Sequence, residues 1–267
     1  MRSLWNGSIS FGLVNVPVKM FAATEDKDIR FRTLHKVCHT PIQYRKFCPT
    51  CEQEVAMDEL VKAYEYEKGR FVIIEEQDLE SLDISQTRSI DIIDFVNLAE
   101  IDPIYFSKSY YLGVTDTGQK AYWLLRKAME ATGKIAVAKV VLRDKQHLAA
   151  VRVLPECLSL AIMFYPDEIR SAQALAPERE ISLQESEIQM ATQLIESLTT
   201  TFTAEKYTDD YRAELLKIID AKIAGEVVAV PAPQQPGKVI DLMEALKASL
   251  ALVEKNKQQQ PERHTGA

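Results

Sequence analysis

Six strand-like runs most constrain what this chain can fold into, because such runs need partners in a sheet. Residues 8–21 alternate, with Val14, Val16, Val18 and Met20 on one face, and this period of two is typical of a half-buried strand. Pro17 within the run predicts an edge strand or a bulge. The other runs are residues 71–74, 110–114, 135–143, 148–154 and 158–164. Together they predict a strand-rich core.

Helices are predicted at one place between the strand-like runs and again after the last of them. Apolar residues from Ala121 to Met129 predict a helix over residues 119–132, with Gly133 at its C-cap. After Pro177, Ser182 and Glu185 form a capping box that predicts the start of a second helix, and a third is expected over residues 209–224. We therefore expect an α+β, mainly β, chain with a core over residues 1–178 and a helical extension over residues 179–226.

The C-terminal part is expected to be a separate segment. Three prolines in residues 227–237 predict a semi-rigid linker. Residues 238–267 follow as a tail whose helix carries an apolar stripe of candidate partner-binding residues, namely Val239, Leu242, Met243, Leu246, Leu250 and Val253. The stripe would suit a groove on a partner protein, or it could fold back onto the chain's own core.

The cysteines point to a metal site in a reducing compartment. Cys48 and Cys51 have the CxxC spacing of half a zinc site, and His35 with Cys38 provides the other half. His39 competes with His35 as the fourth ligand. Four protein ligands leave no open position, so we expect a structural zinc in an insertion near residues 31–55. The alternative is a metal-free reduced loop or a redox pair.

Charge is segregated along the chain, although its net value is −7. Residues 1–50 hold 8 Lys and Arg against 3 Asp and Glu, whereas residues 51–100 hold 4 against 14. A basic face can therefore exist within an acidic protein. The candidate DNA-binding residues are Arg32, Lys36, Arg45, Lys46, Lys139, Arg143 and Arg152. The alternative for each is ordinary solvated surface.

Enzymatic and membrane functions have little support in the sequence. There is no glycine-rich phosphate loop, no GxSxG and no HExxH, so we expect a protein that is not an enzyme. No stretch approaches the roughly 18 apolar residues needed to span a bilayer, and the first residues carry no apolar leader. We expect a cytoplasmic, nucleoid-associated protein with no membrane partner.

Several motifs resemble the prokaryotic Ku family. The most specific is the opening run from Trp5 to Lys19, WNGSISFGLVNVPVK, and further similarity lies at residues 34–36, 63–67, 101–105 and 165–170. The resemblance implies a Ku-type β-barrel core with a bridging insertion, two copies of which form a homodimeric ring around double-stranded DNA ends without reading their sequence. It also implies that residues 239–250 engage the ATP-dependent DNA ligase of non-homologous end joining.

Two other functions stay open at this point. One is a zinc-ribbon adaptor or regulator that binds duplex DNA internally. The other is an enzyme that carries a structural zinc. Preference for linear over circular DNA would separate end binding from internal binding, and turnover of a nucleotide or DNA substrate would favour the enzyme.

Overall fold

The computed structural model of the chain describes residues 1–267 except 82–87, 176, 178–180, 227–241 and 260–267. It divides into two compact units, Met1–Ala172 and Gln173–Ala267, each of which is described by itself. Within the described residues, no helix is both long and apolar enough to cross a membrane.

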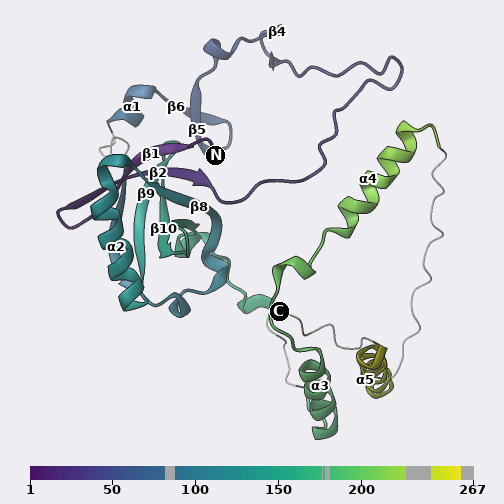
Figure 1. Ribbon diagram of the computed structural model, residues 1–267. Coiled ribbons are helices and arrows are strands. Elements are labelled where there is room, and N and C mark those ends of the chain that lie inside the picture. The colour runs from purple at the N-terminus through teal and green to yellow at the C-terminus, as the bar shows by residue number, and fades with distance from the viewer. Residues whose placement is uncertain (82–87, 176, 178–180, 227–241, 260–267) are drawn as a thin grey trace. The chain divides into compact units, whose positions relative to one another are not determined.

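The first unit is built on a closed barrel of seven strands (Figure 1). Around the barrel the order is β1-β2-β8-β11-β10-β9-β7, and a parallel pairing of β1 with β7 closes it. The strand bounds are β1 Trp5–Phe11, β2 Val14–Ala22, β7 Ser89–Val96, β8 Phe106–Val114, β9 Ile135–Leu142, β10 Lys145–Val153 and β11 Leu158–Met163. The mainly-β core with a few C-terminal helices, expected from the sequence, is thus confirmed.

The barrel interior is a continuous apolar core. Inward residues alternate with outward ones along most strands, so that Val16, Val18 and Met20 of β2 are buried while their neighbours are not. Strand β11 is buried along its whole length, and its last residue, Met163, belongs to a second apolar cluster against which Ile101 and Tyr105 pack. A small barrel filled in this way is a packed scaffold, and its chemistry must lie on its surface and rims.

The run over residues 8–21 is two strands and not the single strand that its alternation predicts. Strands β1 and β2 form a tight hairpin, and Gly12 at the turn has a φ of 57°, which favours glycine. Pro17 lies within β2, which has neighbours on both sides, but the pairing with β8 begins only at Val18. Pro17 therefore has a ladder partner on one side only, which makes the missing N–H tolerable.

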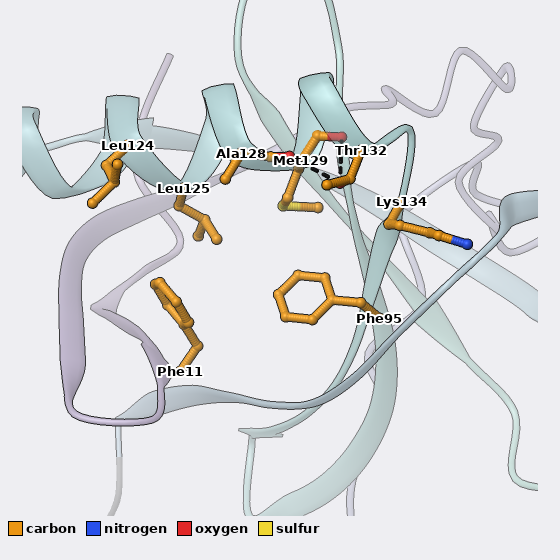
Figure 2. Close-up of a pocket in the computed structure, with 8 residues that line it drawn as sticks. All are labelled: Phe11, Phe95, Leu124, Leu125, Ala128, Met129, Thr132 and Lys134. Atoms are coloured by element: carbon orange, nitrogen blue, oxygen red, sulfur yellow. Dashed lines mark hydrogen bonds between the residues drawn. The ribbon is translucent and has the colours of Figure 1, made fainter.

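Helix α2, Gln119–Thr132, has the bounds that its spacing predicts and covers one rim of the barrel. Gly133 ends it with a φ of 65°. Figure 2 shows Leu125 and Met129 pointing from the helix towards Phe11 and Phe95, at the ends of β1 and β7. These side chains border an apolar hollow of about 350 Å³. We call this end of the barrel the α2 rim.

Between β2 and β7 the chain leaves the barrel as a long arm, residues 23–88. The arm holds two small hairpins, β3 Phe47–Cys48 with β4 Gln53–Glu54, and β5 Lys62–Glu67 with β6 Arg70–Ile74. The short helix α1, Glu76–Glu80, follows β6. Nearly all described arm residues are exposed. Strand β7 itself was not predicted, because a bulge between Ile92 and Asp94 breaks its alternation.

Short 3-10 helices complete the first unit and extend into the second. They are Met57–Glu59, Leu98–Glu100, Pro103–Tyr105, Asp116–Gly118, Pro166–Glu168, Gln173–Leu175 and Ala204–Lys206.

The described residues of the second unit form three α-helices, α3 Glu185–Leu198, α4 Asp210–Ile223 and α5 Leu242–Gln259. The capping box of α3 is formed by Gln184 and Glu187, whose carboxylate accepts the Gln184 N–H at 2.7 Å; the box expected at Ser182 and Glu185 is therefore wrong by two residues. Helices α3 and α5 pack side by side (Figure 1). The expected linker, residues 227–237, and Val239 lie outside the described residues.

Candidate nucleic-acid interface

The first half of the expected zinc site is formed in the arm. His35 Nδ1 lies 3.1 Å from Cys38 Sγ, in a turn closed by the His39 N–H donating to the His35 carbonyl at 2.8 Å. Hydrogen bonds from Thr40 and His35 lower the pKa of Cys38 to about 7. A lowered pKa favours the thiolate at neutral pH, and the thiolate is the form that binds metals.

The second half lies at the β3–β4 hairpin. Backbone N–H groups of Cys51 and Thr50 hydrogen-bond to the Cys48 sulfur and lower the pKa of that thiol. The adjoining Cys48 sulfur in turn raises the pKa of Cys51. The hairpin thus presents two thiols on one turn, with backbone donors aimed at the first.

The two halves fit a zinc ion chemically but are not brought together. Among the described residues, the structure contains no group of three or more His, Cys, Asp or Glu side chains arranged to hold a metal. His35 with Cys38, and Cys48 with Cys51, therefore stand as separate pairs. The donor set of one imidazole and three thiolates suits zinc, whereas the observed geometry supplies only two ligands at a time.

The basic residues of the arm differ in whether their charge is already neutralised. Arg45 forms an ion pair with Glu54 at 2.6 Å. Lys46 donates to Met57 Sδ at 2.9 Å, which leaves its charge uncompensated. Arg32 and Lys36 are exposed, and no ion pair joins either of them to a carboxylate within the described part of the chain. Three of the four arm candidates therefore keep a free positive charge.

The basic residues of the barrel lie on its outer surface and on a turn. Lys139 is exposed on β9, beside Asp91 of β7 and Leu148 of β10 in the strand register. Arg152 is half-buried on the outer face of β10. Arg143 was expected to continue β9, but β9 ends at Leu142 and Arg143 occupies the turn to β10 with a φ of 51°.

Two further basic residues, Lys108 and Lys145, were not among the candidates. They line one hollow together with Arg143, because the first residues of β8 and the β9–β10 turn meet at the same rim of the barrel. No local sequence pattern reveals this, since residues 108 and 145 are far apart in the chain.

Comparison with known proteins gives a consistent result. Residues 10–190 match the family described as the Ku70/Ku80 beta-barrel domain. Relatives named "Non-homologous end joining protein Ku" include those of Desulfitobacterium hafniense, 52% identical over 97% of this chain and 90% of the relative, and Bacillus subtilis, 46% identical over 100% of this chain and 86% of the relative.

A third such relative, from Symbiobacterium thermophilum, is 52% identical over 95% of this chain, but the chain spans only 64% of that relative's length. The matched residues include all strands of the barrel except most of β1, the arm, and the beginning of α3. With a barrel that agrees with the matched domain and relatives that are similar over nearly the whole chain, the protein belongs to the Ku family.

Proposed function

We propose that this protein binds double-stranded DNA ends without regard to sequence, as a homodimer, and recruits an ATP-dependent DNA ligase in non-homologous end joining. The observation that carries the proposal is similarity over nearly the whole chain to proteins named for that process. It disfavours the alternative of an adaptor that binds duplex internally.

The charge distribution supports DNA as a partner. Arg32, Lys36 and Lys46 in the arm, and Lys139 and Arg152 on the barrel, carry positive charge that no ion pair among the described residues neutralises. Such cations attract phosphates at any base sequence, and each phosphate contact gives a log-log salt slope of about −0.9. The global charge of −7 is compatible with this, because only the surface that faces DNA needs to be basic.

The test of end binding is a competition assay. Labelled linear duplex is bound by the full chain and then challenged with unlabelled linear DNA or with a closed circle of the same sequence. Linear competitor should displace the label at far lower concentration than the circle. Equal competition would contradict end binding and would restore the internal-binding adaptor.

Exposed apolar surface on the arm supports a homodimer. In the β5–β6 hairpin, Tyr64 is 65% exposed, Phe71 61% and Ile73 56%. A two-stranded hairpin is marginal by itself, and apolar side chains on both its faces need a cover. A second copy would supply one, because isologous dimers are the commonest assembly. Light scattering at micromolar concentration should give twice the 30.2 kDa chain mass, and the monomer mass would contradict the dimer.

Ligase recruitment is assigned to helix α5. Met243, Leu246 and Leu250 of the expected stripe are half-buried within the second unit, where α5 packs against α3, whereas Leu242 is 58% exposed. The sequence left open that the tail folds back onto the chain's own core. In the structure its helix packs on α3 of the second unit. A ligase that uses the stripe must compete with α3 for it, or must bind the exposed side of α5.

A structural zinc remains part of the proposal. His35, Cys38, Cys48 and Cys51 have the ligand chemistry, and a closure of the loop between the two pairs would bring them to one ion. Elemental analysis of protein prepared without chelator should find about one zinc per chain. A zinc content below about a tenth of an equivalent would leave the two pairs as metal-free thiols, so that no zinc role would survive.

A further inference from the structure

The barrel has a second rim, opposite the α2 rim, and among the described residues no α-helix of the first unit lines it. Here β1 and β8 begin, β2 and β11 end, and β9 turns into β10. The rim surrounds a hollow of about 560 Å³, which we call the barrel mouth. Its size is within the range of small-molecule sites, and the mouths of β-barrels are a common place for them.

The floor of the barrel mouth is aromatic and apolar. Trp5 and Tyr110 line it together with Met20, Leu142 and Ile162, all of which pack on or belong to the barrel core. The Trp5 ring lies over Gly7, where any Cβ would meet the ring and the Arg88 carbonyl. Glycine at position 7 therefore allows Trp5 to lie across the end of the core, which gives a flat ring at the base of the hollow.

The wall of the barrel mouth is basic. Lys108, Arg143, Lys145 and His147 all line it. Lys145 forms an ion pair with Glu168 at 3.1 Å, but no ion pair joins Lys108 or Arg143 to a carboxylate in the part of the chain that the structure describes. Burial, followed by the charge of Lys145, lowers the pKa of His147 and so favours its neutral form. The uncompensated charge therefore comes from Lys108 and Arg143.

The backbone of Arg143 has a left-handed conformation that arginine rarely adopts. Arg143 and Asp144 have φ values of 51° and 62°, and they form a two-residue turn between Leu142 and Lys145. Turns of this kind favour Asn, Asp and Gly, because a left-handed backbone is unfavourable for other side chains. Asp144 therefore fits the turn, whereas Arg143 is strained in it. Strained residues of this sort concentrate at ligand-binding sites.

We propose that the barrel mouth binds a nucleotide, with its phosphates on Lys108 and Arg143 and its base against Trp5 and Tyr110. An anion would relieve the repulsion between cations that share one hollow. An aromatic floor favours a flat base over a bare inorganic anion, since bases stack on aromatic side chains. The site shares Arg143 with the candidate DNA-binding residues, whereas Lys139 and Arg152 lie on the outer face of the barrel, outside the lining of the mouth.

The two tryptophans make the test specific. Trp123 lies on α2 at the other rim, so a Trp123→Phe variant of the full chain leaves Trp5 as the only tryptophan. Its fluorescence is titrated with magnesium-free ATP, with adenosine and with inorganic tripolyphosphate. Lys108→Ala and Arg143→Asn remove one charge each, and asparagine tolerates the positive φ at position 143. Lys120→Ala is the matched control, because it removes an exposed cation of α2, at the other rim.

The proposal requires that ATP quenches Trp5 fluorescence saturably. The affinity for ATP should fall about tenfold in Lys108→Ala and in Arg143→Asn, and should stay within about twofold in Lys120→Ala. Adenosine and tripolyphosphate should each bind more weakly than ATP, since each lacks one half of the contacts. Absence of saturation up to millimolar ATP, or equal losses in all three variants, would overturn the site. Tripolyphosphate binding as tight as ATP would overturn the nucleotide assignment.

Discussion

Replacing Tyr122 by phenylalanine removes one hydroxyl that joins helix α2 to two strands of the barrel. The hydroxyl donates to the Leu112 carbonyl of β8 at 2.7 Å and accepts the Leu158 N–H of β11 at 2.7 Å. Tyr122 is only 4% exposed, so water has little access to either backbone group. The substitution keeps the ring and its packing and removes only this bridge.

The cost follows from the two groups left behind. Each buried backbone group that loses its partner costs about 1–2 kcal/mol, which gives about 2–4 kcal/mol for the free energy of unfolding. Urea denaturation should show a lower midpoint with an unchanged slope. Tyr44→Phe is the control: Tyr44 is 89% exposed, and its variant should stay within about 0.5 kcal/mol of the natural chain.

The same bridge has a pH signature. Burial raises the pKa of Tyr122 above its usual value of 10.0, so the unfolded state loses this proton first as the pH rises. The stability that Tyr122 contributes is therefore present below pH 10 and is lost as the pH rises through the folded-state pKa. The difference in stability between the natural chain and Tyr122→Phe should shrink above pH 10. If the free energy of unfolding of Tyr122→Phe differs from that of the natural chain by less than about 0.5 kcal/mol at pH 7, the reasoning is refuted. The Leu112 carbonyl and the Leu158 N–H would then find hydrogen-bond partners without the hydroxyl.

Three other predictions test the scaffold, the arm and the tail. Arg126→Leu should destabilise the barrel by about 2–3 kcal/mol in the same assay, because the buried guanidinium donates to the carbonyls of Leu154, Pro155 and Glu156. A loss below about 0.5 kcal/mol would show that water satisfies these carbonyls when the guanidinium is absent. Arg32→Ala should reduce the salt slope of DNA binding by about one unit. Arg45→Ala should reduce it less, because Arg45 already forms an ion pair with Glu54. Equal effects of the two substitutions would contradict the distinction between paired and unpaired cations. A chain truncated after Pro236 should still dimerise and bind DNA ends but should no longer stimulate the ligase. If the truncated chain instead loses DNA affinity and still stimulates the ligase, the recruiting surface lies outside the tail.

The sequence by itself determined the elements whose signals are local. Helix α2 has its predicted bounds because apolar spacing and the Gly133 cap both lie within one stretch of chain. Strands β9, β10 and β11 were found to within a few residues for the same reason. The opening run from Trp5 to Lys19 carried the family resemblance, since this resemblance depends on the order of residues alone and not on their contacts in the fold.

Only the tertiary structure decided what depends on contacts between distant residues. Alternation cannot tell one strand from two, so the hairpin at Gly12 was missed, and β7 was missed because its bulge breaks the period. The pairing of β11 with both β8 and β10 brings Lys108 and Arg143 to one rim. The arm leaves the two halves of the expected zinc site apart. Which distant residues meet is set by strand register and by ring closure, and these depend on the whole barrel, because no stretch of chain holds both partners of such a contact.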